Sequence, residues 1–169
     1  NNIKVTFVLC SIVDKKMIDH YFEKHKPDIV FHAAAFKHVN ILENASIQAV
    51  NTNIFGTNNL INSSISHNVQ KFIFVSTDKA VNPTSIMGIT KRFSEILIQS
   101  YSKLSSTKFA IVRFGNVVGS SGSVIPLFIS QIKSNKDITI TSPEMTRFLM
   151  SLDNAVELVE YAFNNYNQG

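Results

Sequence analysis

The run Lys71-Phe72-Ile73-Phe74-Val75-Ser76-Thr77-Asp78-Lys79 joins an apolar segment directly to a polar one. Residues 72–75 are apolar on successive positions, as in a strand of a parallel sheet that helices cover on both faces. In such sheets ligands bind beyond the carboxyl ends of the strands. The run therefore predicts a buried parallel strand that ends in a loop able to carry chemistry.

Strands and helices are predicted to alternate along the rest of the chain. Three more β-rich runs lie at 4–9, 28–32 and 108–114, and helical apolar spacing is found at 15–25, 46–67, 88–104, 124–133 and 154–163. The helical stretches are long enough for right-handed crossovers between parallel strands. The alternation predicts the α/β class, as one doubly wound parallel sheet of Rossmann-like form.

The composition supports one globular domain and excludes several functions. With 169 residues, 44% of them hydrophobic, the chain can bury one core. The formal charge of +4 comes from 16 Lys+Arg and 12 Asp+Glu without long basic runs, so we expect no nucleic-acid partner. Cys10 is the only cysteine, which excludes an internal disulfide. No run approaches the roughly 20 apolar residues of a membrane span.

The loops after three of the strands hold residues suited to binding or catalysis. Residues 32–38, His-Ala-Ala-Ala-Phe-Lys-His, follow the second strand, and their small side chains would let a flat ligand approach the backbone. Residues 76–80 follow the third strand, and Gly115-Asn116 follows the fourth. Their polar and ionisable side chains are the candidates for the reaction itself, and no metal site is expected.

Longer motifs around these loops resemble a known family. They lie at 28–39, 51–57, 76–91, 113–126 and 146–150. The most specific is the Ser-Thr-Asp-Lys-Ala-Val-Asn-Pro-Thr run at 76–84, with Lys91 fourteen positions after Thr77. Over nearly its whole length the chain resembles the CapD- and WbpM-type nucleotide-sugar dehydratases of polysaccharide biosynthesis. These belong to the extended short-chain dehydrogenase/reductases.

The resemblance implies a reaction on a sugar nucleotide in which bound NADP or NAD stores a hydride temporarily. The sugar is oxidised at C4, water is eliminated across C5 and C6, and the hydride returns to C6. By motif correspondence, Thr77 holds the C4 oxygen, Asp78 protonates the leaving hydroxyl and Lys79 is the C5 base. An acid at Asp78 needs a raised pKa, which attraction to Lys79 opposes. The alternative is a turn in which Asp78 caps the backbone and Lys79 is solvated.

Met87 and Lys91 lie one helical turn apart and project from the same helix face. In the wider superfamily these two catalytic positions hold a Tyr-x-x-x-Lys pair. A thioether can neither donate nor accept the proton of the C4 hydroxyl. The resemblance therefore makes Asp78 or Lys79 the substitute base and keeps Lys91 on the nicotinamide ribose. An exposed helix lysine is the alternative for Lys91.

Two further sets of residues would bind the ligands on the same resemblance. The cofactor set is Asp14, Ala33, Ala34, Ala35, Lys91 and Gly115, and the substrate set is Lys37, Asn116, Val124, Pro126 and Arg147. Val124, Pro126 and Phe128 would line the uridine side of the cleft. Asn116 would reach the diphosphate, and Arg147 would pair with phosphate bidentately. A turn asparagine, a first-turn helix proline and a surface ion pair are the alternatives for Asn116, Pro126 and Arg147. His38 borders the sugar or is a structural hydrogen-bonder, and Asn53 belongs to a helix bend that positions the site.

The glycine-rich turn of a dinucleotide-binding fold is missing from this sequence. None of its 6 glycines precedes Gly56, whereas the pyrophosphate normally meets a helix amino terminus after the first strand. We therefore expect residues 1–169 to be one partial NAD(P)-binding domain, truncated at both ends, without the glycine loop and the end of the substrate region. Expressed alone, it is expected to be poorly soluble and inactive.

Three functions are open at this point. The first is a UDP-N-acetylglucosamine 4,6-dehydratase of bacterial surface-polysaccharide biosynthesis. The second is a UDP-sugar 4-epimerase or a C5-inverting dehydratase, and the third is a non-catalytic sugar-nucleotide binding module. The triplet at 77–79 favours elimination, because simple epimerisation needs no C5 base. We expect the full-length protein to be a cytoplasmic homo-oligomer; whether membrane helices precede the catalytic domain, as in some relatives, stays open.

Overall fold

The computed structural model describes residues 3–120, 124–140 and 142–165. Its main sheet has three parallel strands, β1 (Ile29–His32), β2 (Lys71–Thr77) and β3 (Lys108–Phe114), in the order β1-β2-β3. β2 pairs along its whole length with β3, with Lys71 beside Lys108 and Thr77 beside Phe114. The parallel α/β sheet predicted from the sequence is confirmed.

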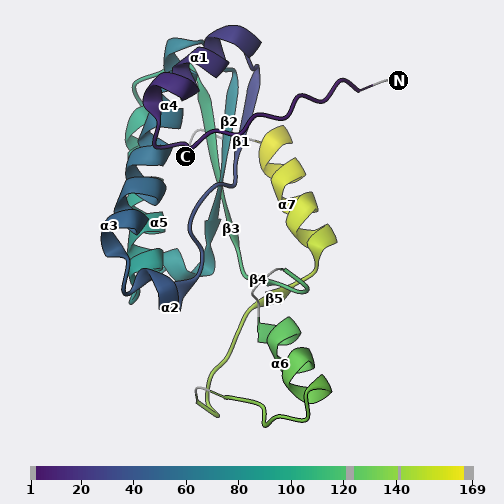
Figure 1. Ribbon diagram of the computed structural model, residues 1–169. Helices are drawn as coiled ribbons and strands as arrows, with labels where there is room; N and C mark the ends of the chain where they lie inside the picture. Colours follow the sequence, from purple (N-terminus) through teal and green to yellow (C-terminus); the bar gives the residue numbers. More distant parts are fainter. Residues whose placement is uncertain (1–2, 121–123, 141, 166–169) are drawn as a thin grey trace.

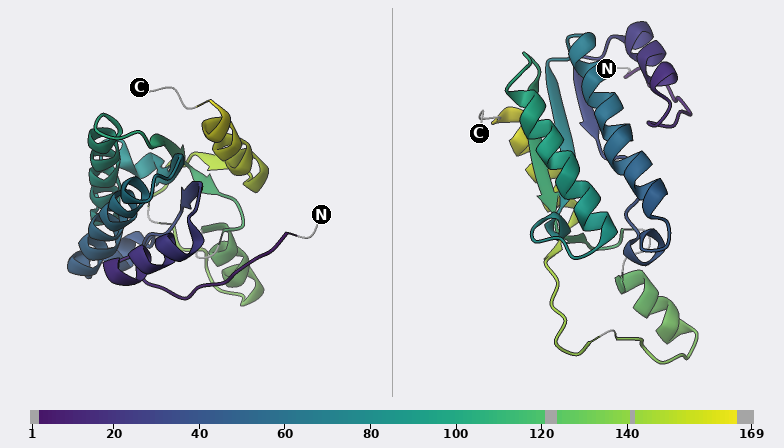
Figure 2. Two further views of the ribbon diagram at one scale, coloured as in Figure 1. Left: turned by 90° about the horizontal axis from the view of Figure 1, so that it is seen from above. Right: turned by 90° about the vertical axis from the view of Figure 1, so that its left-hand side faces the viewer.

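Helices cover both faces of this sheet (Figure 1). α1 (Lys15–His25), α4 (Thr57–Ser66) and α5 (Ile86–Ser102) lie on one face, and α7 (Leu152–Asn164) lies on the other. Seen from above, the sheet lies between α7 and the layer of α4 and α5 (Figure 2). The doubly wound arrangement is thus confirmed for the described residues. Among them, no helix combines the length and apolar character needed to cross a bilayer.

Serine side chains explain where two of the helices begin. Ser85 Oγ accepts a hydrogen bond from the Gly88 N–H at 3.2 Å, and Ser151 caps α7 in the same way. Such caps satisfy amide groups of the first turn that have no partner inside the helix. α5 and α7 therefore begin before the predicted residues 88 and 154.

The stretch predicted as one helix at 46–67 is continuous but has a π-helical middle. α3 (Ser46–Ala49) passes into η1 (Val50–Gly56) and then into α4. The Asn53 side chain, buried within η1, accepts a hydrogen bond from the Phe36 N–H at 2.9 Å and donates one to Thr90 Oγ1 at 3.0 Å. Asn53 thereby links the loop after β1 to α5. Helical segments of this kind are frequent near functional sites.

Large apolar side chains fill the space between the sheet and its main helix layer. Phe72 and Phe74 of β2, Ile61 of α4 and Ile98 of α5 are buried there. Burying each of them stabilises the fold by roughly 1.5–3 kcal/mol. His32 of β1 lies among them, with its ring centre 5.2 Å from that of Phe74. The core therefore holds β1 and β2 against α4 and α5.

Residues 4–9 do not form the predicted strand. This segment has no regular structure in the described chain and pairs with no strand, and Phe7 and Leu9 are almost completely exposed. A β-rich run becomes a strand only where a neighbouring strand satisfies its backbone N–H and C=O groups. The prediction is wrong because β-propensity does not supply that neighbour.

A smaller region lies beyond the carboxyl ends of the main strands. β4 (Asn116–Val117) and β5 (Leu149–Met150) pair in parallel as a separate sheet, which the sequence pattern did not predict. α6 (Val124–Lys133) has the predicted bounds and lies below this pair in Figure 1, with no buried residue. Ser121, Gly122 and Ser123 of the motif at 113–126 lie outside the described residues.

His32 makes the stability of the fold dependent on pH. Burial lowers the pKa of its imidazole from 6.5 to about 3, and the positive charge of Lys91 adds to the effect. Between these values the unfolded chain binds a proton that the folded chain does not bind, so protonation favours unfolding. We expect the free energy of unfolding to be fully retained above about pH 6.5 and to fall towards about pH 4.5, by up to about 1.4 kcal/mol per pH unit.

Urea unfolding of the wild type, His32→Gln and His20→Gln between about pH 4.5 and 7 measures this dependence. His20 is an exposed histidine of α1 and serves as the matched control. The slope of stability against pH should be smaller in His32→Gln and unchanged in His20→Gln. Equal slopes in all three proteins would assign the pH dependence to other groups.

Candidate active site

A cavity of about 670 Å³ opens at the carboxyl ends of β1, β2 and β3. Its walls combine the loop after β1, the end of β2 with the 3₁₀ turn η2 (Asp78–Ala80), the start of α5 and the loop after β3, and α2 (Val39–Leu42) adds to one side. The sequence pattern predicted neither η2 nor α2. The predicted site residues that line the cavity are Ala33, Ala35, Lys37, Thr77, Lys79, Met87, Lys91, Gly115, Asn116, Val124 and Arg147.

The triplet at 77–79 forms one hydrogen-bonded unit. Thr77 Oγ1 donates to Asp78 Oδ1 at 2.9 Å and accepts from the Lys79 backbone N–H at 3.4 Å. Lys79 Nζ donates to Asp78 Oδ1 and to Asn116 Oδ1, both at 2.9 Å. Thr77, rather than Asp78, is thus the residue that caps the turn. Lys79 joins η2 to the loop after β3 instead of extending into solvent.

Asp78 is held as an ionised carboxylate. Burial acts to raise its pKa, but hydrogen bonds from Lys79 and Thr77 outweigh burial, and the net pKa lies below the usual range. The raised pKa expected of a general acid is therefore not found in this arrangement. Thr77 and Lys79 line the cavity, whereas Asp78 does not.

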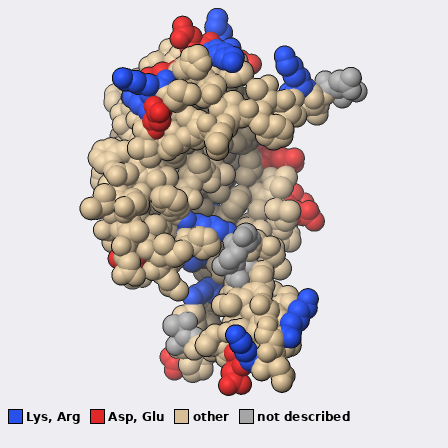
Figure 3. Space-filling model, viewed as in Figure 1, with Lys and Arg blue, Asp and Glu red and all other residues tan. Residues whose placement is uncertain are grey.

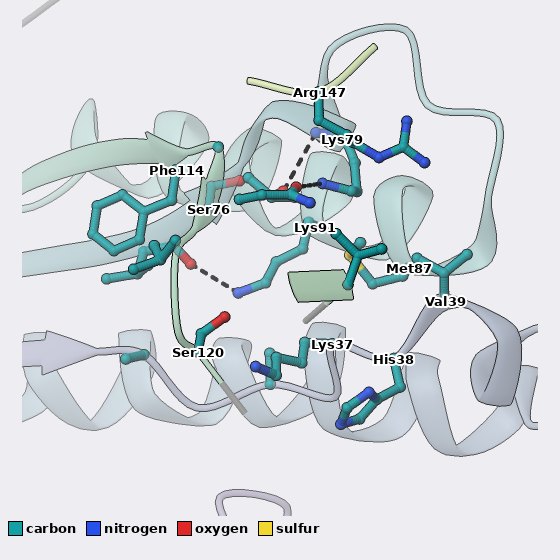
Figure 4. A pocket seen from close by; sticks show the side chains of 18 of the residues that line it. Lys37, His38, Val39, Ser76, Lys79, Met87, Lys91, Phe114, Ser120 and Arg147 are labelled. Carbon is teal, nitrogen blue, oxygen red and sulfur yellow. Dashed lines mark hydrogen bonds between the residues drawn. The ribbon is translucent and has the colours of Figure 1, made fainter. Parts of the chain in front are cut away.

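Lys91 projects from α5 into the cavity (Figure 4). Its residue surface is only 7% exposed, and its Nζ donates to the Val75 carbonyl at 2.8 Å and lies 4.4 Å from the centre of the Phe74 ring. Burial lowers the pKa of Lys91 to about 8, and the Glu95 carboxylate opposes that effect. The alternative of an exposed helix lysine does not apply.

Met87 lies one helical turn before Lys91 and also lines the cavity. It is buried and packs against Leu42 and Ala49, so that it connects the cavity wall to α2 and α3. Because a thioether transfers no proton, Met87 itself can take no part in proton transfer at this wall.

The cavity lining is cationic. Lys37, Lys79, Lys91 and Arg147 contribute to it, and no Asp or Glu does so in the part of the chain that the structure describes. In Figure 4, Lys37 and His38 lie on the side opposite to Lys79 and Arg147. Lys and Arg atoms are visible in the hollow between the main body and the region of α6 (Figure 3). A cleft lined by one sign of charge attracts ligands of the other sign, such as phosphates.

Four predicted binding residues do not line this cavity. They are Asp14, Ala34, Pro126 and Phe128. Asp14 instead caps α1, where its Oδ1 accepts a hydrogen bond from the Met17 N–H at 3.1 Å. Their roles towards a cofactor or a uridine remain predictions.

The sequence analysis assigned no role to Glu95. Its buried carboxylate accepts hydrogen bonds from Ser76, Arg92 and Arg113, close to the residues that line the cavity. One signal was present, because Glu95 follows Lys91 by four residues and thus shares its helix face.

Doubly wound sheets bind their ligands at the strand ends, where the cavity of this chain lies, and this fold and site define a Rossmann-like enzyme domain. Over residues 1–169 the chain matches the family described as polysaccharide biosynthesis protein, and it belongs to that family. The predicted resemblance to the CapD type of the extended short-chain dehydrogenase/reductases is confirmed.

Curated relatives carry two kinds of names. A UDP-glucose 4-epimerase of Rickettsia rickettsii (strain Sheila Smith) is 46% identical over 172 residues, which cover 100% of this chain and 50% of the relative. The capsular polysaccharide biosynthesis protein CapD of Staphylococcus aureus is 47% identical over 160 residues, which cover 94% of this chain and 27% of the relative. The chain thus spans half or less of the length of these relatives.

Solved structures share the fold. The X-ray structure of Pen from Bacillus thuringiensis superposes with a TM-score of 0.88 at 45% identity, over 94% of this chain and 49% of that one. Several structures with 19–21% identity and TM-scores of 0.78–0.87 contain NAD, and at that identity they support the fold alone.

Gly88 permits the close approach of α5 to η2. A Cβ at this position would meet the Lys79 carbonyl oxygen and lie 3.2 Å from Pro83 Cβ. Gly88→Ala should therefore displace η2 and destabilise the fold by roughly 1–3 kcal/mol, although alanine is the better helix former.

Thermal unfolding followed by circular dichroism checks this expectation for Gly88→Ala. Gln99→Ala, at an exposed position of the same helix, is the control and should leave the melting temperature unchanged or slightly raised. If Gly88→Ala has the same melting temperature as the control, α5 and η2 can move apart without loss of stability, and the expectation is wrong.

Proposed function

We propose that the complete protein is a UDP-N-acetylglucosamine 4,6-dehydratase that uses NADP or NAD. The observation that carries the proposal is the hydrogen-bonded Thr77-Asp78-Lys79 unit beside a cavity whose described lining has four cations and no carboxylate. The family description and the name of the CapD relative agree with a role in surface-polysaccharide synthesis. Because the chain spans only part of its relatives, the activity is proposed for the complete protein.

The Lys91 end of the cavity suits a nicotinamide cofactor. NADP or NAD would supply the acceptor and the donor of the hydride. Lys91 Nζ has three N–H donors, and beside its bond to Val75 it can donate to ribose hydroxyls. Ala33, Ala35 and Gly115 have small or no side chains, so a flat ring can approach their backbone.

The remaining cations suit the diphosphate of a UDP-sugar. Arg147 bonds to the Thr146 carbonyl and contacts the Met145 sulfur, and its guanidinium has five donors, enough to bind a phosphate as well. Asn116 accepts from Lys79 through Oδ1, which leaves its amide N–H groups directed to other acceptors. Lys37 lies on the opposite side of the cavity in Figure 4, so phosphate oxygens would meet cations on two sides.

The Asp78–Lys79 pair can perform the elimination if one proton moves between them. In the reactive state the proton is on Asp78 and Lys79 is neutral. Lys79 Nζ takes the proton from C5, and Asp78 gives its proton to the C6 hydroxyl, which leaves as water. The pair is then the ion pair seen here, with a 2.9 Å separation between Nζ and Oδ1. Completion of the reaction requires a proton at C5 again, which Lys79 Nζ would return, and the proton that the C4 hydroxyl gives up on oxidation would restore Asp78.

Binding of the sugar favours the neutral form of this pair. The side chains of Lys79 and Asp78 are 33% and 24% exposed, so a sugar bound against Lys79 would remove water from Lys79 and from its ion pair with Asp78. Loss of water disfavours the charged form of each group. Thr77 Oγ1, which also lines the cavity, would hold the C4 oxygen while the proton moves.

A UDP-sugar 4-epimerase is the second candidate, because the Rickettsia relative with an epimerase name is 46% identical over the whole chain. Epimerisation at C4 requires no proton transfer at C5, whereas dehydration, with or without inversion at C5, does. Exchange at C5 and loss of the C6 hydroxyl therefore separate the candidates.

Proton NMR of the complete protein with UDP-N-acetylglucosamine and cofactor in deuterated water makes this distinction. A 4-keto-6-deoxy product with deuterium at C5 is the expected result. A 4-epimer that retains the C6 hydroxyl would establish the epimerase instead. Unchanged substrate would contradict both enzymatic functions for this sugar.

Asp78→Asn and Lys79→Gln should each lower kcat for dehydration at least about 100-fold, because each removes one of the two proton-transfer groups. Lys103→Gln, at an exposed position after α5, is the matched control and should keep wild-type kcat. Product formation per minute, followed by NMR, gives the comparison. Full activity in both triplet variants would reduce the triplet to a capping turn.

A further inference from the structure

Glu95 is a fully buried carboxylate of α5 whose two oxygens both accept hydrogen bonds. Oε1 accepts from Ser76 Oγ at 2.7 Å and from Arg113 Nε at 2.9 Å. Oε2 accepts from Arg113 Nη2 at 2.7 Å and from Arg92 Nη1 at 2.9 Å. Burial acts to raise the pKa of Glu95, but these hydrogen bonds, led by those from Arg113, outweigh it and the net pKa is lowered. Glu95 is therefore ionised in the folded protein.

The partners of Glu95 lie on the segments that form the cavity. Ser76 is on β2, directly before the triplet, and Arg113 is near the end of β3, before the loop that holds Asn116. Lys91 is one turn earlier on α5, the helix of Glu95 itself. One carboxylate thus connects the three segments that supply the triplet, Asn116 and Lys91.

The ion pairs of Glu95 with Arg92 and Arg113 contribute little to the stability of the fold. The side chains of Arg92 and Arg113 are 39% and 41% exposed, so water would solvate both guanidinium groups without Glu95. The Glu95 side chain is only 1% exposed, and burying a carboxylate carries a desolvation cost that its attraction to arginine roughly offsets. The net gain in stability is small. What the arrangement does specify is the position of two strand ends relative to one helix.

We infer that Glu95 is a positioning residue of the candidate active site. Its two-point contact with Arg113 and its bond from Ser76 hold the ends of β3 and β2 against α5. That placement brings Lys79 within 2.9 Å of Asn116. Glu95 does not line the cavity, so it acts through these neighbours.

Glu95 also acts on Lys91 through its charge. The carboxylate raises the pKa of Lys91 against the larger effect of burial. Beside the larger effect of burial, Lys91 in turn lowers the pKa of His32 on β1, and the cavity that Lys91 lines also has Lys37, His38, Lys79 and Arg147 in its wall. Loss of the Glu95 charge would therefore remove an anion that stabilises the ammonium form of Lys91.

The test compares the complete wild-type protein with Glu95→Gln, Arg113→Lys and Glu23→Gln. Glutamine keeps the volume of the buried side chain, lysine keeps the charge but loses the two-point contact, and Glu23 is an exposed glutamate of α1 that serves as control. Three quantities are measured: kcat and KM for the sugar nucleotide, the melting temperature, and the pH titration of Lys91. The titration uses NMR of ¹³C-labelled lysine, with the Lys91 signal assigned by its loss in Lys91→Arg.

We expect Glu95→Gln and Arg113→Lys to lower kcat about 10- to 100-fold, as misplacement of reacting groups does, with KM changed less than about threefold. Lys91 should titrate at lower pH in Glu95→Gln and as in the wild type in the other two proteins. Variants with a lower melting temperature but wild-type kcat and an unshifted Lys91 titration would overturn the inference and leave Glu95 a structural residue.

The kcat and KM measurements rest on the proposed function. The proposed function and the inference about Glu95 can nevertheless fail separately. A wild-type protein that converts no UDP-sugar would refute the proposed function. The Lys91 titration would then test whether Glu95 acts on Lys91, because the titration requires no turnover. An unshifted titration in folded Glu95→Gln would be evidence against the inference in that case.

Discussion

The parallel pairing of β2 with β3 is the constraint on which the candidate site depends. Its register places Thr77 beside Phe114, so the loops that follow the two strands leave the sheet side by side. Lys79 and Asn116 are then close enough for a 2.9 Å hydrogen bond. A slip of one residue would exchange the side chains that face the two helix layers and would separate the two loops. The register that buries the core therefore also sets the geometry of the site.

Buried hydrogen bonds determine the position of the helices on this sheet. Apolar contacts alone would not fix that position. His32 pairs with Thr57 at 2.8 Å, Asn53 pairs with Thr90, and Glu95 collects its donors from β2, β3 and α5. Large apolar side chains tolerate small shifts of a helix, whereas a buried polar atom that loses its partner costs about 1–3 kcal/mol. These polar links lie near the carboxyl ends of the strands, where a shift would also misplace the cavity residues.

The sequence predicted most of the fold and about half of the site, for reasons that differ by residue. Apolar periodicity identified the long helices and three strands, but residues 4–9 needed a neighbouring strand that composition does not reveal. The motif at 76–84 pointed to the triplet and to Lys91. It could not show that Lys79 holds Asp78 ionised, because that depends on a distance. The sequence did not predict a role for Glu95, because its hydrogen bond from Arg113 joins residues that are eighteen positions apart in the chain.

Four cations line the cavity, and one of them, Lys79, is already paired with Asp78, so the cavity attracts an anion without depending on one. Burial has lowered the pKa of Lys91, one of these four residues, to about 8. A phosphate in the cavity would stabilise the ammonium form and raise that pKa again. Ligand binding and the charge of Lys91 are thus coupled, and each favours the other. Met87 has a thioether that transfers no proton, so under the proposed function proton transfer at this wall would depend on lysines whose charge responds to the ligand.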